Sequence, residues 1–90
     1  MIIFDGFGHM VSTESAEELH AFAARIGLKR SWYQNPSKGS KMQKDVHPEW
    51  GCHYDLTTFS KRDAAAARGA EFVQPCTEIV KRAWWVKKER

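Results

Sequence analysis

Short apolar runs alternate with helical patterns along this chain of 90 residues. Met1 to Phe4 is apolar and is followed by the turn-forming residues 5–8, which predicts a buried strand that ends in a turn. From Ala16 to Ile26, apolar residues recur with the spacing of one helical face, and Ser15 with Glu18 forms a capping box before it. The first third of the chain is therefore expected to form a strand and a helix.

The rest of the chain repeats this alternation. Residues 29–34 and 71–74 are expected to be extended, and residues 60–68 and 77–88 to be helical, the last helix being basic. Residues 35–51 hold two prolines, two glycines and three lysines, which predicts a long surface loop. The order predicts an α/β fold, a small sandwich with a short, mostly parallel sheet and about three helices. We expect residues 1–90 to form a single domain.

Composition narrows the class of protein. No apolar run approaches the roughly 20 residues of a membrane span, and the first residues lack a secretion signal, so we expect a cytoplasmic protein without membrane contact. Cys52 and Cys76 are too few for a disulfide framework, which predicts free thiols. All but one of the 14 basic residues follow residue 28, which favours an anionic partner.

The polar residues just before the second predicted helix indicate a site. His53, Tyr54 and Asp55 precede this helix, and its first turn carries Lys61 and Arg62. Cations at the start of a helix oppose the positive end of its dipole, so we expect an anion beside them. Phosphate is the anion that helix N-termini commonly bind. The sequence therefore predicts a nucleotide or another phosphorylated small ligand.

Two further histidines are candidates for this site. His20 lies at the edge of the apolar face of the first helix with small neighbours, so it is either a border histidine or a site residue. His9 and His53 both lie at boundaries of predicted regular structure. Strand ends and helix starts gather at one edge of a parallel α/β sheet. We therefore expect the three imidazoles to converge.

Three kinds of chemistry suit these groups. Histidines and a carboxylate can bind a divalent metal, but no His-x-x-x-His spacing occurs, so we expect no metal and no other cofactor. Alternatively, two imidazoles act as acid and base in phosphodiester hydrolysis, with Asp55 fixing the tautomer of His53. In the third case the ligand is bound without being altered. The residues do not separate the last two cases, and we favour catalysis slightly.

The candidate residues fall into two groups. The proposed catalytic residues are His9, His20, His53 and Asp55, and the proposed ligand-binding residues are Lys61, Arg62, Tyr54, Trp32, Tyr33 and Asp5. In the basic C-terminal helix, Trp84 is expected to pack in the core and Trp85 to be free. We expect this helix to support homo-oligomer formation in preference to nucleic-acid binding.

Several of these motifs together resemble a known family. The segments are His9, Glu17-Glu18-Leu19-His20-Ala21-Phe22-Ala23-Ala24-Arg25-Ile26-Gly27-Leu28, Trp32-Tyr33-Gln34, His53-Tyr54-Asp55-Leu56-Thr57, Lys61-Arg62 and Gly69-Ala70. In this order they are similar to the domain-of-unknown-function family 4031. That family consists of small bacterial and phage proteins without an assigned activity. The resemblance implies a shared site, and it does not name a reaction.

Overall fold

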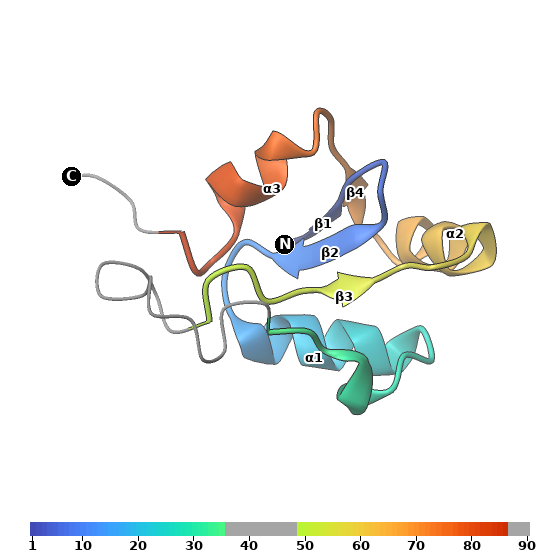
Figure 1. Cartoon of the computed structure of the whole chain (residues 1–90). Helices are drawn as coiled ribbons and strands as arrows, with labels where there is room; N and C mark the ends of the chain where they lie inside the picture. The colour runs from blue at the N-terminus through green and yellow to red at the C-terminus, as the bar shows by residue number, and fades with distance from the viewer. Residues whose placement is uncertain (36–48, 87–90) are drawn as a thin grey trace.

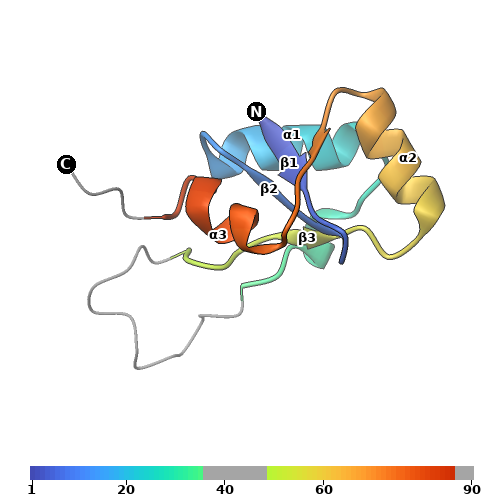
Figure 2. The same cartoon turned by 90° about the horizontal axis from the view of Figure 1, so that it is seen from above.

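A four-stranded sheet forms the centre of the computed structural model, which describes residues 1–35 and 49–86. Its strands are β1 (Ile2–Phe4), β2 (His9–Ser12), β3 (Tyr54–Asp55) and β4 (Glu71–Phe72), in the spatial order β3-β2-β1-β4. Helices α1 (Ala16–Arg25) and α3 (Thr77–Arg82) cover opposite faces of the sheet, and α2 (Phe59–Ala67) lies beside one end (Figures 1 and 2). The predicted α/β sandwich with three helices is confirmed.

The sheet is mixed, whereas a mostly parallel sheet was expected. Only β1 and β4 are parallel, while β2 runs antiparallel to both β1 and β3. The cause is a tight reversal after β1, in which the Gly8 amide donates to the Asp5 carbonyl at 3.0 Å. Gly8 has a φ of 86°, a conformation that glycine adopts without strain. The chain therefore returns as a hairpin and forms β2 beside β1.

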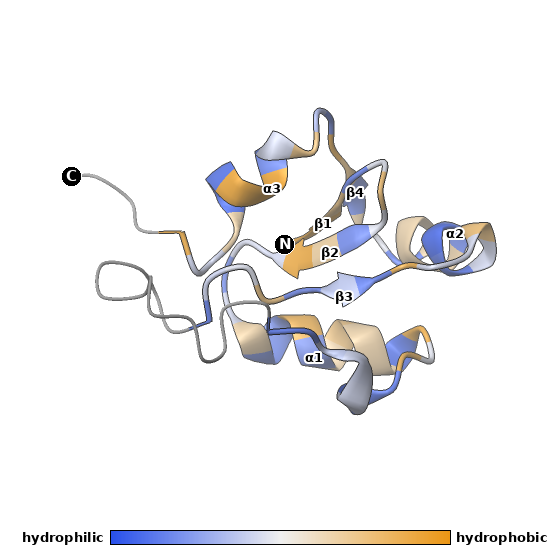
Figure 3. Ribbon diagram, viewed as in Figure 1, coloured by the Kyte–Doolittle hydropathy of each residue, from blue (hydrophilic) through white to orange (hydrophobic). Residues whose placement is uncertain are grey.

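Alternating side chains of the strands build two apolar clusters, one on each face of the sheet. On the α1 face, Phe4 and Met10 pack with Leu19 and Tyr54. On the other face, the strands and the α3 segment supply Ile3, Val11, Cys52, Val73, Ile79, Ala83 and Trp85. Figure 3 shows apolar stretches in β2 and on α3. Strand β1 is thus buried on both faces, which accounts for the apolar run at the N-terminus.

Side-chain caps fix the starts of the two longer helices. Ser15 caps α1 as predicted, because its hydroxyl accepts from the Glu18 amide at 3.1 Å. Thr58 caps α2 in the same way, since its hydroxyl accepts from the Lys61 amide at 3.1 Å. Both helices lie within about one residue of the predicted bounds, the usual scatter at helix ends. These local patterns were sufficient to place α1 and α2.

Two segments differ from their predicted conformation. Within residues 29–34, which were expected to be extended, Arg30–Trp32 forms a 3-10 turn, η1. The helix expected over residues 77–88 ends at Arg82, because Ala83 is extended with a ψ of 151°. Residues 87 and 88 lie outside the described part of the chain, as does most of the predicted loop (residues 36–48).

Of the two C-terminal tryptophans, Trp84 packs against the core as expected, whereas Trp85 differs from its expected role. Trp85 is only 2% exposed and was expected to be free, whereas Trp84 is half-buried. The indole Nε1 of Trp85 donates to the Cys52 carbonyl at 2.9 Å. This bond satisfies the one polar group of the buried ring and ties the end of the described chain to the segment before β3.

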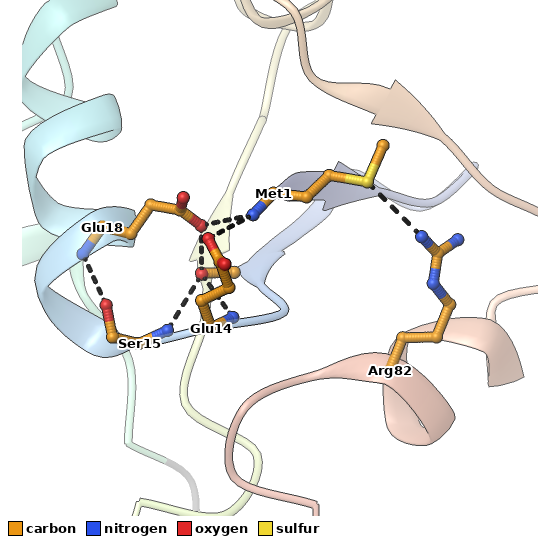
Figure 4. A network of polar contacts seen from close by, with 6 residues as sticks. Met1, Glu14, Ser15, Glu18 and Arg82 are labelled. Carbon is orange, nitrogen blue, oxygen red and sulfur yellow. Dashed lines mark hydrogen bonds and ion pairs between the residues drawn. The ribbon is translucent and has the colours of Figure 1, made fainter.

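A polar network links the starts of β1 and α1 (Figure 4). The Met1 amine lies 2.7 Å from Glu18 Oε1 and 3.1 Å from Glu14 Oε2, and the Ser12 hydroxyl donates to Glu18. Burial alone would lower the pKa of the amine, but the two carboxylates outweigh it and raise this pKa. From α3, Arg82 approaches the Met1 sulfur. The network therefore joins both helical layers to β1.

None of the helices within residues 1–35 and 49–86 is long and apolar enough to cross a membrane.

Candidate functional site

His9, His53 and Asp55 meet on the α3 face of the sheet and form what we call the His9–His53–Asp55 centre. His9 opens β2 and pairs in register with Asp55 of β3, and His53 lies two residues before Asp55, on the same side of the strand. The two imidazoles contact edge to face, with ring centroids 5.1 Å apart. One ligand atom from each of the three residues lies within 4.8 Å of the others.

A buried carboxylate orients His9. Asp5 is 1% exposed, and its Oδ1 accepts from the backbone amides of Phe7 at 2.9 Å and His9 at 3.0 Å. Its Oδ2 lies 2.9 Å from Nδ1 of the His9 ring. A carboxylate in this position accepts the Nδ1 proton, so a neutral His9 carries its free lone pair on Nε2. Asp5 thus positions the His9 ring, whereas the sequence predicted only a ligand-binding role for it.

His53 is oriented by a backbone carbonyl. Its Nδ1 lies 2.7 Å from the Gly51 carbonyl, which can only accept, so Nδ1 carries a proton. Its Nε2 lies 3.2 Å from Oδ1 of Asp55, and Oδ2 of Asp55 accepts from Nε2 of Gln34. In a neutral His53 both Nε2 and Oδ1 would be acceptors. A cation between these two atoms would stabilise this arrangement.

Two cavities flank the His53–Asp55 pair. The first has a volume of about 330 Å³ and is lined on its polar side by Asp5, His9 and His53. The remaining wall consists of Trp50, Gly51, Cys76, Thr77, Ile79, Val80 and Trp85. The second has a volume of about 350 Å³ and is lined by Ser31, Trp32, Gln34, Asp55 and Thr57. Each cavity therefore combines at least one tryptophan with one member of the pair.

His20 does not join this centre, so the expected convergence of three imidazoles is wrong for His20. Its Nδ1 lies 2.8 Å from the Tyr54 hydroxyl, and its ring contacts the Tyr33 ring at 4.5 Å. Tyr54 directly precedes Asp55 and points to the α1 face of the sheet. Burial, and then repulsion by Arg30, lowers the pKa of His20.

Tyr33 and Tyr54 belong to the same α1-face cluster as His20. Tyr54 is buried and Tyr33 is partly buried against the core, with their rings 5.4 Å apart. Burial raises the pKa of both phenols, so both are neutral near pH 7. Of the three aromatic residues predicted to bind a ligand, Trp32 lines the second cavity.

Lys61 and Arg62 have backbone partners, so the anion predicted from their place in the helix is not required. Lys61 Nζ donates to the Ile26 carbonyl at 3.3 Å, at the negative C-terminal end of α1. Arg62 donates through Nε to the Leu56 carbonyl at 3.3 Å and through Nη1 to the Gly6 carbonyl at 3.0 Å. The positive charges of Lys61 and Arg62 at the start of the helix are therefore offset by the partial negative charge of these carbonyl oxygens.

Sequence reasoning missed several groups around the centre. Trp50, Gly51 and Trp85 contribute to the first cavity, and Gln34 holds Asp55. The adjacency of Trp50-Gly51 to His53 was available as a clue, as was the position of Gln34 in the Trp32-Tyr33-Gln34 motif. Neither clue shows that Gln34 and His53 form a β-bridge, because they lie far apart in the chain.

Comparison with protein families agrees with the resemblance noted in the sequence. A family model described as "Protein of unknown function (DUF4031)" matches residues 5–85. The chain belongs to this family. In this DUF4031 domain the match spans the whole centre and both cavities, from Asp5 to Trp85. Neither the curated proteins nor the solved structures contain a match to the chain.

Proposed function

We propose that this domain binds a nucleotide or another phosphorylated small ligand and hydrolyses its phosphodiester bond at the His9–His53–Asp55 centre. The observation that carries the proposal is that His53 and Asp55, whose Nε2 and Oδ1 are 3.2 Å apart, each line a cavity, of about 330 and 350 Å³ respectively. A phosphodiester joins two organic groups through one phosphorus atom. A ligand of this kind suits a polar centre whose residues line two cavities.

The walls of the two cavities favour flat, partly apolar groups such as nucleobases. Trp50 is 38% exposed in the first cavity, and Trp32 is 46% exposed in the second. A base stacked on an aromatic side chain gains about 1–3 kcal/mol. Ser31 and Thr57 supply two hydroxyl groups to the second cavity, whereas the first has one, that of Thr77, in a mostly apolar wall. We expect the second cavity to select its occupant by hydrogen bonds and the first by apolar contact.

Hydrolysis requires two contributions from the protein. A base must take a proton from the water that attacks phosphorus and return it to the leaving oxygen, and a positive charge must face the phosphate oxygens while the bond to that oxygen breaks. Lys61 and Arg62 are bonded to carbonyl oxygens of the protein. Among the described residues we therefore assign both tasks to the His9–His53–Asp55 centre.

A ligand screen tests the proposal. Mononucleotides and linear and cyclic dinucleotides would be compared by thermal shift, with and without added Mn²⁺ or Zn²⁺, followed by chromatography of the recovered ligand. We expect dinucleotides to stabilise the protein more than mononucleotides and to be cleaved. Cleavage should be lost in His53→Asn and retained in His20→Asn, whose residue lies on the opposite face. No stabilisation would contradict the proposal. A stabilising ligand recovered intact would remove hydrolysis and leave capture.

A further inference from the structure

We infer that the His9–His53–Asp55 centre binds one divalent transition-metal ion through Nε2 of each histidine and a carboxylate oxygen of Asp55. The inference deepens the proposed function and rests on it for the role of the ion, which would face the phosphate. Metal binding itself requires no organic ligand. The two proposals can therefore fail separately.

The first argument is the tautomer of the two rings. Nδ1 of His9 faces Oδ2 of Asp5 at 2.9 Å, and Nδ1 of His53 faces the Gly51 carbonyl at 2.7 Å. Both partners are acceptors, so both neutral rings present an unprotonated Nε2. Metal-binding histidines almost always donate their other ring nitrogen to a carboxylate or a backbone carbonyl. His9 is supported by the carboxylate of Asp5, and His53 is supported by the backbone carbonyl of Gly51.

The second argument is the contact between two acceptors. Nε2 of His53 and Oδ1 of Asp55 are 3.2 Å apart, and zinc bonds of about 2.0–2.2 Å would place two tetrahedral ligand atoms about 3.4 Å apart. A proton would also relieve this repulsion, but it would join only these two atoms. A metal ion also engages His9, whose ligand atom lies within the same 4.8 Å group. The cluster of three acceptors therefore favours the metal.

The donor set selects the class of metal. Two imidazoles and one carboxylate suit Zn²⁺, Mn²⁺ or Fe²⁺, whereas Mg²⁺ and Ca²⁺ prefer oxygen ligands alone. Three protein ligands leave coordination positions for water or for phosphate oxygens. The side chains of His9 and Asp55 are 42% and 32% exposed, so an ion can reach the centre from solvent. A metal at this position would polarise a bound water and supply the charge that phosphate requires.

Substitution by asparagine gives a sharp test. The side-chain amide of asparagine can donate from about the position of Nδ1, so His9→Asn and His53→Asn keep the bonds to Asp5 and Gly51 and delete Nε2. Asp55→Asn removes the ligand charge. His20→Asn and Asp63→Asn are matched controls, because His20 lies on the opposite face and Asp63 is exposed on α2. Binding of Zn²⁺ alone to metal-stripped protein would be measured by calorimetry, and binding of Co²⁺ by its visible spectrum.

We expect one ion per chain and a loss of affinity of at least about 100-fold in each of the three site variants, with the controls within about twofold of the wild type. Absence of stoichiometric binding, or equal binding by His53→Asn, would overturn the inference. Cys76 also lines the cavity, so loss of binding in Cys76→Ser alone would assign the ion to the thiol and would overturn it as well.

A measurement on the wild type covers the case in which a variant does not fold. On addition of Zn²⁺, the ¹⁵N resonances of Nε2 in His9 and His53 should shift, while those of His20 should not. Unchanged resonances at His9 and His53 would contradict the inference. If metal binds but no phosphorylated ligand stabilises the protein, the proposed function fails and the metal site remains.

Discussion

Gly8 and Leu56 approach each other so closely that no side chain fits between them. The Leu56 amide donates to the Gly8 carbonyl at 2.7 Å, and a Cβ added to Gly8 would lie 2.6 Å from the Leu56 carbonyl oxygen. Arg62 donates to the same Leu56 carbonyl and to that of Gly6. This contact fastens the turn after β1 to the segment after β3, and it positions His9 beside Asp55.

The first prediction follows from this contact. Gly8→Ala should lower the free energy of unfolding by about 2 kcal/mol or more, because the new Cβ meets backbone and the φ of 86° is strained for alanine. Gly6→Ala is the control, since nothing lies within 4 Å of its added Cβ, and it should change stability by less than about 0.5 kcal/mol. Urea denaturation of both variants measures the difference. Equal effects would contradict the steric argument.

A second prediction concerns the tautomer of His9. In Asp5→Asn, the oxygen should stay with the amides of Phe7 and His9, so the new NH₂ group should face Nδ1 of His9. Nδ1 must then accept, and the ring proton moves to Nε2. We expect the ¹⁵N spectrum to show this change and metal affinity to fall by about 10- to 100-fold. An unchanged tautomer would show that Asp5 does not orient the ring.

A third prediction separates structural from ligand-binding roles of Arg62. Arg62→Met removes the donors to the Leu56 and Gly6 carbonyls and should cost about 1–2 kcal/mol of stability. Arg68→Met, at the exposed end of the same helix, is the control and should be nearly neutral. Both variants would be compared by urea denaturation. Full stability of Arg62→Met, with weaker binding of phosphorylated ligands, would return Arg62 to the role expected from the sequence.

The fourth prediction is a pH dependence carried by His20. Its pKa in the folded protein is lower than the ordinary value of about 6.5, so below that pH the unfolded chain binds a proton more readily than the folded one. The stability contributed by neutral His20 is therefore present above about pH 6.5 and is lost as the pH falls below it. His20→Asn can retain a hydrogen bond to Tyr54 and should lose less stability between about pH 7.5 and 5. Equal losses in denaturation series would contradict this.

Much of the fold could be predicted because its signals are local. The Ser15 cap, the apolar face of α1 and the turn after Phe4 each involve residues a few positions apart. The mixed sheet depends on the direction in which β2 leaves that turn, which apolar periodicity does not encode. The burial of Trp85 depends on the Cys52 carbonyl, a partner 33 residues away.

The candidate site was predicted in part for the same reason. His9, His53 and Asp55 were identified by their chemistry and by their places at the ends of strands. His20 was misplaced because its helical neighbours do not show which sheet face α1 covers. The sequence indicated that Lys61 and Arg62 need negative charge nearby. The carbonyl groups of Ile26 and Gly6 that supply it lie 35 and 56 residues away. Sequence identified the polar groups that meet in the centre, and tertiary packing decided their partners.

Strand β3 has a consequence for how binding and folding are linked. Its two residues serve opposite faces, since Tyr54 enters the aromatic core and Asp55 enters the centre. A slip of one position along β2 would exchange them, placing a carboxylate in the core and a phenol beside His9. Any ion or ligand that binds Asp55 therefore also holds Tyr54 in place. The binding energy of such an ion therefore stabilises the whole domain. Removing the ion with a chelator would loosen the packing of Tyr54 on the α1 face, although the ion itself lies on the α3 face.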